Sequence, residues 1–380
     1  MHLVSATNDF TIVGIPRPSF PIVLWEDMRS CWEANEFLRY YLMRGSIGSR
    51  KSWEPTGRAL YDYFSFLEAH GLIWDDVDRG EKTNLVAAYR MYCFDVAALA
   101  RNTVRKRIHY VCQFYEYALR EGWTTRLPFD YETRRVPMSA GFLAHVDASG
   151  GQRQTRSVMP RSHKGMVAFL SKDQVTALLT AAKNPHHAAI IKLALDSGLR
   201  REELASFPLS YVFDPDKTHD GSRNLRITLD PEDGSSMKTK GSRKRVIVIR
   251  RKLMRILYDY AKHWRGERAS RSKGGHAQLF LNQDGEPWSA DGKGIEAMVR
   301  SLGQKVGVSA HPHMLRHTYA THTLVALQRQ RSIEPLVFLQ KQLGHASIQT
   351  TMIYLHLINE FADDAVLAYD DELNDWLDVA

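Results

Sequence analysis

Apolar residues recur at helical spacing through the first third of the chain. Within residues 102–123, for example, Val104, Ile108, Val111 and Tyr115 form one apolar stripe. The same spacing is found in three earlier segments, which occupy residues 24–43, 53–71 and 83–95. We therefore predict that this part of the chain folds as an all-helical domain.

A different pattern follows the first domain. Over residues 135–165 few apolar positions recur, and Gly, Ser and Arg are frequent, which indicates a linker. Ser171 then stands before an apolar-periodic run as a helix N-cap, and a second helical pattern is broken at Gly198. Two alternating runs, 225–229 and 245–249, flank a turn-rich connection and predict one small antiparallel sheet. The rest of the chain returns mainly to helical spacing.

The predicted fold is mainly α with a small antiparallel β-sheet: a helical N-terminal domain and a mixed α/β domain. The predicted parts are an N-terminal extension (1–23), a helical domain (24–134), a basic linker (135–165), a second domain (166–358) and an acidic tail (359–380).

The composition narrows the class of protein. A chain of 380 residues with 44% hydrophobic residues can fill two cores. It has no run of eighteen apolar residues and no basic patch ahead of a long apolar stretch, so we expect a soluble, cytoplasmic protein. Cys31, Cys93 and Cys112 lie far apart in apolar, helix-like segments. We therefore expect reduced packing residues rather than disulfides or a zinc site.

The charge is distributed unevenly. The formal net charge is +8, but residues 359–380 hold eight acidic residues and no Lys or Arg, so that residues 1–358 carry +16. A strongly basic body indicates a polyanionic partner. The tail also has apolar residues at roughly helical spacing, and we expect this stripe to be buried against a protein surface. These residues are Phe361, Val366, Leu367, Leu373, Trp376 and Leu377.

Four separated stretches carry side chains suited to breaking and rejoining a phosphodiester. They are SGLRREEL with Arg200, MKTKGSRKR with Lys240, HPHMLRHTYATH with His313 and Arg316, and QLGHASIQTTMIY with His345 and Tyr354. Arginine forks match the non-bridging phosphate oxygens, a lysine can protonate a leaving alkoxide, and histidines can orient groups or move protons. A tyrosine surrounded by cations becomes a nucleophile whose phosphate ester conserves the energy of the broken bond. Such a set can act without a metal ion or a cofactor.

Together these stretches resemble the tyrosine recombinases, the phage integrase family. The family pattern is an Arg in a G-L-R-x-x-E-L box, a hairpin Lys, His-x-x-Arg-His, and L-G-H with a Tyr nine residues after its His. The matching residues are Arg200 with Glu203, Lys240, His313 with Arg316, and His345 with Tyr354. The resemblance covers about residues 165–358 well. It extends more loosely to the helical N-terminal part, which looks like the family's core-binding domain.

The resemblance implies a site-specific DNA recombinase or integrase that closes as a C-shaped clamp on double-stranded DNA. Tyr354 would attack the scissile phosphate to give a 3′-phosphotyrosine, and two rounds of exchange in a tetramer would pass through a Holliday junction. The other implied roles are phosphate binding by Arg200 and Arg316, protonation of the leaving 5′ oxygen by Lys240, assistance by His313 and His345, and bracing of an arginine by Glu203.

The basic residues outside these boxes are candidates for contacts with the DNA backbone. Those on the last helix of the first domain and in the linker are Arg105, Lys106, Arg153, Arg156 and Arg161. Accessory DNA-bending factors are further expected partners. We expect a protein of a bacterium, phage or mobile element that associates with the nucleoid. The tail would fold back on its own catalytic domain or, as the resemblance suggests, dock in a groove of a neighbouring subunit.

Two assignments within the boxes have rivals. Lys238 is an alternative to Lys240, because the hairpin is longer than the family usually has. His313 and His317 stand one turn apart and can pair on a metal ion, but no acidic or Cys partner lies at ligand spacing and no His-Glu-x-x-His motif is present. We expect no metal site.

Two other classes of protein stay open. A type IB topoisomerase uses the same phosphotyrosine chemistry to relax supercoils, although the His-x-x-Arg-His and L-G-H boxes look more like those of recombinases. A non-catalytic DNA-binding protein of the same fold is the second alternative. His311 and His322 are interpreted as structural or DNA-adjacent residues.

Overall fold

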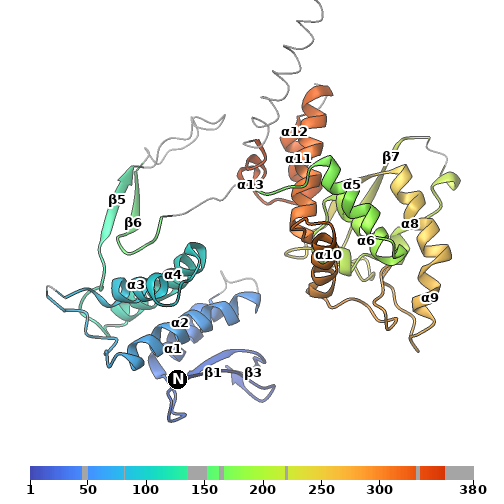
Figure 1. Ribbon diagram of the computed structural model, residues 1–380. Coiled ribbons are helices and arrows are strands. Elements are labelled where there is room, and N and C mark those ends of the chain that lie inside the picture. Colours follow the sequence, from blue (N-terminus) through green and yellow to red (C-terminus); the bar gives the residue numbers. More distant parts are fainter. Residues whose placement is uncertain are drawn as a thin grey trace, which may run out of the picture. The chain divides into compact units, whose positions relative to one another are not determined.

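The chain folds into two compact units. The computed structural model describes residues 1–44, 50–80, 82–135, 152–161, 167–218, 221–330 and 334–355. The units are Met1–Gly165, blue to green in Figure 1, and Met166–Ala380, green to red. Within the described ranges, no helix is both long enough and apolar enough to cross a membrane.

The first unit is mainly helical, as the apolar periodicity predicts. Its α-helices are α1 (Trp32–Met43), α2 (Trp53–Ala69), α3 (Leu85–Asp95) and α4 (Arg101–Arg120), with a short 3₁₀ turn, η1 (Arg50–Ser52). The predicted stripe on α4 is fully buried, and α4 packs against α2. At this contact the hydroxyls of Tyr63 and Tyr115 lie 2.6 Å apart, so that two buried phenols satisfy each other. Cys31, Cys93 and Cys112 are buried among the packed side chains of this unit.

The N-terminal residues form strands that the sequence analysis did not predict. The antiparallel pairs are β1 (His2–Ser5) with β4 (Pro21–Leu24), and β2 (Thr11–Ile12) with β3 (Ile15–Pro16). Phe20 and Val23 are buried in the same core as α1–α4. The helix expected from residue 24 begins only at Trp32, because Val23 exchanges two hydrogen bonds of 2.8 Å with the side chain of Asn35. The helical prediction is therefore wrong for residues 24–31, and the predicted N-terminal extension, residues 1–23, contains strands.

A further strand pair lies at the edges of the predicted linker. β5 (Tyr131–Arg135) pairs antiparallel with β6 (Gln152–Arg156), so the prediction of irregular structure is wrong for residues 152–156. The segment after β6 is fixed to the helices of its own unit: Val158 is buried, and Arg90 donates to its carbonyl oxygen at 3.1 Å. These strands have no alternating apolar face, which is why the sequence pattern did not indicate them.

The second unit is a helical assembly with one small sheet. Its α-helices are α5 (Lys172–Ala181), α6 (Pro185–Ser197), α7 (Arg201–Ala205), α8 (Arg251–His263), α9 (Arg265–Ala269), α10 (Lys293–Lys305), α11 (Pro312–Gln330), α12 (Pro335–Leu343) and α13 (Ile348–Met352), and its 3₁₀ turns are η3 (Leu209–Tyr211) and η4 (Pro215–Lys217). The sheet consists of β7 (Asn224–Leu229) and β8 (Arg245–Arg250), paired antiparallel as predicted, with Leu225 opposite Ile249. The predicted cap is present, since the Ser171 hydroxyl accepts a hydrogen bond from the Gln174 amide at 3.2 Å.

The break at Gly198 is a close packing point. Gly198 ends α6 in the left-handed conformation with φ +66°. A Cβ atom there would lie 2.6 Å from the Tyr319 ring of α11 and 2.7 Å from Leu343 at the end of α12. Only glycine lets these three elements approach so closely.

A buried amide joins α12 to β8 and α6. The Gln342 side chain accepts from the Val248 amide at 2.8 Å and donates to the Val248 carbonyl at 3.0 Å and the Ser197 carbonyl at 3.2 Å. The ends of α6 and α12 and the middle of β8 therefore meet at one place, beside α11.

Candidate active site

Arg316 lies at the centre of this meeting point. Its side chain on α11 is 1% exposed, and its Nη1 and Nη2 donate to the carbonyls of Gly198 and Leu343, each at 2.7 Å. These carbonyls end α6 and α12, where helix dipoles favour a cation. Burial lowers the pKa of Arg316 to about 9, and the positive charge of Arg200 contributes. The guanidinium still remains a cation at neutral pH.

Arg200 is held by a carboxylate that a second arginine shares. It stands at the N-terminus of α7, where the Glu203 carboxylate accepts from its backbone amide at 2.9 Å and from its Nη1 at 3.1 Å. Its Nη2 donates to the Gly344 carbonyl at 3.1 Å. Arg245, at the start of β8, donates to both Glu203 oxygens at 2.8 and 2.7 Å. Glu203 is 1% exposed, yet Arg245 and Arg200 hold its pKa below the ordinary value against the opposing effect of burial.

Three histidine rings lie near the arginines. The Nδ1 atom of His345 lies 2.9 Å from Oγ1 of the buried Thr351, one turn of chain before Tyr354. His313 and His317, one turn apart on α11, have ring centroids separated by 4.2 Å. Burial, together with neighbouring cations, lowers the pKa of His345 and of His317 to about 3 each. Both imidazoles are therefore neutral at physiological pH.

His313 sits closer to solvent than the other two rings. Its pKa is also lowered, first by partial desolvation and then by the nearby charges of Arg316, His311 and Arg200. His311 and His322, interpreted from the sequence as structural or DNA-adjacent, each make a contact within the unit: His311 Nδ1 accepts from the Met314 amide at 3.3 Å, and His322 Nε2 lies 2.9 Å from the Leu170 carbonyl.

Tyr354 is enclosed by these groups. The side chain is 1% exposed, and its hydroxyl lies 2.9 Å from Nδ1 of His317. The His345 ring is stacked beside the phenol, with a 6.4 Å centroid separation and an interplanar angle of 10°. Burial raises the pKa of Tyr354, while the charges of Arg316 and Arg200 act in the opposite direction. The phenol is thus protonated in the protein alone, with two cations placed to favour its ionised form.

The two candidate lysines lie in the connection between β7 and β8. Lys240 occupies an exposed turn that is closed by the Ser242 amide, which donates to the Thr239 carbonyl at 3.1 Å. Lys238 is also exposed, but its backbone amide donates to the Ser206 hydroxyl at 3.0 Å. Within the described part of the chain, neither ammonium group makes a hydrogen bond or an ion pair. The six predicted catalytic residues are thus brought together except for Lys240, whose side chain contacts none of the others.

The candidates for DNA contacts differ in how available they are. Lys106 and Arg161 are exposed. Arg105 donates to the Pro160 carbonyl. Arg156 makes two hydrogen bonds to Glu116, at 2.5 and 2.9 Å, and its side chain is 14% exposed.

Arg156 therefore fixes β6 to α4, which argues against a role in contacting DNA. The side chain of Arg153 lies outside the described part of the structure, and so does the tail at residues 359–380.

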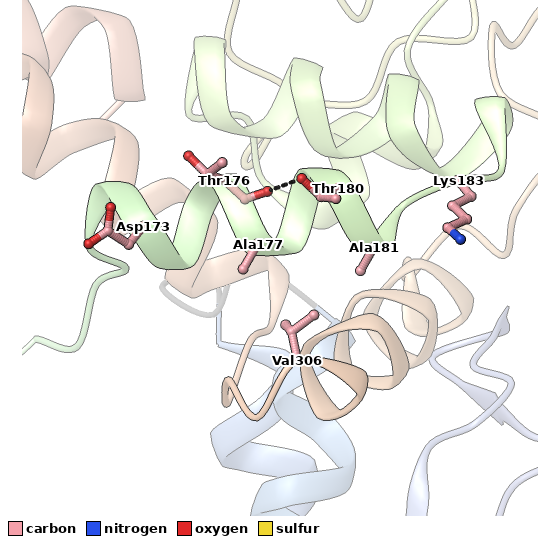
Figure 2. A pocket seen from close by; sticks show the side chains of 7 residues that line it. All are labelled: Asp173, Thr176, Ala177, Thr180, Ala181, Lys183 and Val306. Atoms are coloured by element: carbon pink, nitrogen blue, oxygen red, sulfur yellow. Dashed lines mark hydrogen bonds between the residues drawn. The ribbon is translucent and has the colours of Figure 1, made fainter.

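One surface pocket of the second unit does not include Tyr354. It measures about 570 Å³ and is formed by one face of α5 and the end of α10, as Figure 2 shows. None of the catalytic candidates lines it. Its lining residues are Asp173, Thr176, Ala177, Thr180, Ala181, Lys183 and Val306. In the described ranges, no three His, Cys, Asp or Glu side chains gather as a metal site would require.

Three residues that contact the predicted site directly were not assigned to it from the sequence. They are Arg245, which binds Glu203; Thr351, which binds His345; and His317, which was considered only as a metal ligand. One signal was available for His317, because residues four apart on a helix share a face. Arg245 and Thr351 carried no comparable signal.

Comparisons with known proteins agree with this arrangement. Residues 168–360 match the Phage integrase family. The tyrosine recombinase XerC of Bacillus subtilis (strain 168) is 26% identical over 278 residues, covering 71% of this chain and 75% of the relative. The tyrosine recombinase XerA of Saccharolobus solfataricus is 30% identical over 218 residues, covering 57% and 60%.

A solved structure of similar fold is the Tn1549 transposon integrase in complex with transposon right end DNA. The TM-score is 0.57 at 17% identity, over 85% of this chain and 94% of that one. The fold is therefore that of tyrosine-dependent DNA recombinases and integrases. The chain belongs to the phage integrase family and is a tyrosine recombinase.

Proposed function

We propose that this enzyme is a site-specific recombinase or integrase that breaks and rejoins double-stranded DNA through a 3′-phosphotyrosine at Tyr354. The observation that carries the proposal is the enclosure of this one phenol by two arginines and neutral histidines from separate parts of the chain. Such preorganised donors stabilise the charge that develops on a phosphate during attack.

Arg200 and Arg316 would hold the scissile phosphate. Each guanidinium has five N–H donors, and the two hydrogen bonds that each makes to protein oxygens leave others for phosphate. Because both side chains are already fixed, they lose little freedom when the phosphate binds. Glu203 would keep Arg200 in place.

The remaining proton transfers fall to three groups. The neutral His345 has its Nδ1 engaged by Thr351, so its Nε2 would face the phosphate. His313 would assist from the same side. Lys240 would move with its exposed turn to protonate the leaving 5′ oxygen, and Lys238 remains its rival. The chemistry is a transesterification: the phenol of Tyr354 would lose its proton to His313 or His345 as its oxygen bonds to phosphorus, while the P–O5′ bond breaks and O5′ takes a proton from the lysine. Its reversal with a new 5′-hydroxyl joins the partner strand. This sequence needs no metal ion or ATP.

Double-stranded DNA is the proposed partner, supported by the body charge of +16 and by the DNA complex of the similar Tn1549 integrase. Complete strand exchange would involve four subunits and a Holliday junction. Accessory DNA-bending factors would be further partners. The reaction would take place at the nucleoid or on a mobile element. The tail would restrain cleavage by docking in a neighbour. The relatives' names favour recombination over the relaxation of supercoils by a type IB topoisomerase.

Covalent capture of DNA tests the proposal. Nicked duplexes made from the DNA that flanks the enzyme's own gene should trap the wild-type protein as a denaturant-resistant adduct. Tyr354→Phe should bind the same duplexes without forming the adduct. EDTA should leave adduct formation unchanged. An equally abundant adduct with Tyr354→Phe, or loss of the adduct in EDTA, would contradict the proposed mechanism.

A further inference from the structure

The hydroxyl of Tyr354 has one hydrogen-bond partner among the described residues. That partner is Nδ1 of His317, at 2.9 Å. His317 is not among the six residues to which the catalytic roles above are assigned. Its ring stands one turn beyond His313 on α11 and is inclined by 58° to the phenol, at a centroid separation of 5.6 Å.

The charge states of both partners allow the Tyr354 hydroxyl to be the donor of this hydrogen bond. Burial, together with the neighbouring His313 and Arg316, lowers the pKa of His317 to about 3. Burial raises the pKa of Tyr354. A neutral imidazole has one nitrogen without a proton, and a protonated phenol has one proton to donate. In the tautomer that carries its proton on Nε2, Nδ1 of His317 accepts this hydrogen bond from the Tyr354 hydroxyl.

No other contact in the described structure sets the direction of this hydroxyl. His345 is the nearest alternative, but its ring lies parallel to the phenol and its Nδ1 is engaged by Thr351. The backbone amide of Tyr354 donates to the Thr351 carbonyl at 3.1 Å, which fixes the main chain but not the phenolic oxygen. With its proton directed at His317, the oxygen keeps its lone pairs on its other sides, where an electrophile would have to approach.

We propose that His317 is a positioning residue for strand cleavage: Nδ1 of His317 holds the Tyr354 hydroxyl and sets the direction of the nucleophile before DNA binds. The inference rests on the proposed function, because it gives His317 its role relative to Tyr354 as the nucleophile. His317 takes up no proton in this role. It acts as a fixed acceptor and lowers the cost of reaching the geometry of attack.

Two amide substitutions separate a fixed acceptor from a titrating base. In His317→Asn the amide oxygen takes the place of Nδ1, two bonds from Cβ, but it cannot be protonated near neutral pH. In His317→Gln the amide reaches the place of Nε2 and leaves the Nδ1 position without an acceptor. His317→Leu removes the polar group altogether. Thermal unfolding of each variant monitors the fold, and the Asn and Gln pair carries the test if the Leu variant does not fold.

Two measurements read out the result. The first is the rate of adduct formation on nicked duplexes under single-turnover conditions. His317→Asn should stay within about threefold of wild type, whereas His317→Gln and His317→Leu should be slower by about ten- to a hundredfold, the range expected when a reacting group is misplaced. The second is the ¹⁹F spectrum of 3-fluorotyrosine at position 354 without DNA. It should be nearly the same for wild type and Asn, and shifted or broadened for Gln and Leu.

The outcomes distinguish this inference from the proposed function. If wild type forms no more adduct than Tyr354→Phe, the proposed function fails, and the ¹⁹F spectra still decide whether His317 orients the phenol. If wild type reacts and all three variants react equally well, the positioning role is wrong. If wild type reacts and His317→Asn is as slow as His317→Leu, a titrating imidazole is required, which also overturns the proposal.

Discussion

Arg245 donates one hydrogen bond to each carboxylate oxygen of Glu203, at 2.8 and 2.7 Å, although neither residue would touch DNA in the proposed mechanism. The pair is almost completely buried, with side-chain exposures of 11% and 1%. Glu203 also binds the backbone and side chain of Arg200. Arg245 therefore satisfies a buried carboxylate that holds Arg200 in place.

Removing Arg245 should destabilise the protein and disturb Arg200. In Arg245→Leu the free energy of unfolding should fall by about 2–4 kcal/mol, because a buried carboxylate loses one of its two cationic partners. Urea denaturation measures this loss. Arg300→Ala is the matched control, since Arg300 pairs with Glu296 at an exposed i,i+4 position and should cost less than about 1 kcal/mol. Equal costs for the two variants would show that burial of the Glu203 pair has no energetic weight.

The pH dependence of stability should reflect the neutral, buried His345. Its pKa is about 3 in the folded protein and near 6.5 when unfolded, so the folded state resists protonation. The contribution of the neutral His345 to the free energy of unfolding is therefore fully present above about pH 6.5. It is lost as the pH falls towards 3, because the unfolded state binds the proton first.

Between pH 6.5 and pH 4 the free energy of unfolding should fall by about 1–2 kcal/mol less in His345→Asn than in the wild type, after allowance for partial solvent screening. Denaturant unfolding at each pH measures the difference. His263→Asn is the control for the substitution itself, because His263 lies on α8 outside the site. Parallel profiles for wild type and His345→Asn would contradict the proposed neutral state.

The two hairpin lysines can be separated by the leaving group. A substrate with sulfur at the 5′-bridging position needs no proton donor, because a thiolate leaves far more readily than an alkoxide. Lys240→Ala should cleave the natural substrate at least a hundredfold more slowly but cleave the sulfur substrate at nearly the wild-type rate. If the sulfur substrate restores cleavage by Lys238→Ala instead, Lys238 is the residue that protonates the leaving 5′ oxygen.

The salt dependence of DNA binding should separate exposed from structural arginines. Lys106 and Arg161 are exposed, so replacing both with Ala should reduce the slope of log K against log salt by about 2 if each meets one phosphate. Arg156→Ala should instead lower the thermal stability of the first unit and leave the slope unchanged, because Arg156 is bound to Glu116. The reverse result would place Arg156, and not the exposed residues, on the DNA.

The sequence predicted those features that depend on neighbours along the chain. The stripe on α4, the cap at Ser171, the break at Gly198 and the β7–β8 pair all follow from local spacing, and the structure contains each of them. The strands of the first unit were missed for a physical reason. β1 and β4 are four residues long, and β5 and β6 are polar, so their pairing is stabilised by contacts distant in sequence.

The candidate site divides in the same way. The family boxes indicated which side chains would gather, and Arg200, Arg316, His345 and Tyr354 do so. They did not indicate the partners that fix those side chains, such as Arg245 for Glu203. A hydrogen-bond partner is chosen by distance in the folded structure, and β8 lies forty residues from α7 in sequence. The choice between Lys240 and Lys238 as the proton donor does not follow from the boxes for another reason. Both lie in an exposed connection, and the position of such a segment depends on what it contacts.

Gly198 provides the last prediction, because it joins the packing of the second unit to the proposed phosphate site. Its carbonyl accepts from Arg316, and the space that a Cβ would need is occupied by Tyr319 at 2.6 Å and Leu343 at 2.7 Å. Gly198→Ala should therefore lower the free energy of unfolding by about 2–4 kcal/mol, through overpacking and through the positive φ angle. The rate of DNA cleavage should also fall. An added methyl group would push the Gly198 backbone away from Tyr319 and Leu343, and this would displace the carbonyl that accepts from Arg316.

Gly122→Ala is the matched control for Gly198→Ala. Gly122 has a similar backbone angle, φ +74°, but no atom lies within 4 Å of its Cβ position. This variant bears only the conformational cost of about 1 kcal/mol and should cleave DNA normally. Urea denaturation and the adduct assay measure both effects. Equal losses of stability in the two variants would mean that the left-handed conformation alone accounts for the glycine, and that the close approach of α6, α11 and α12 tolerates an added methyl group.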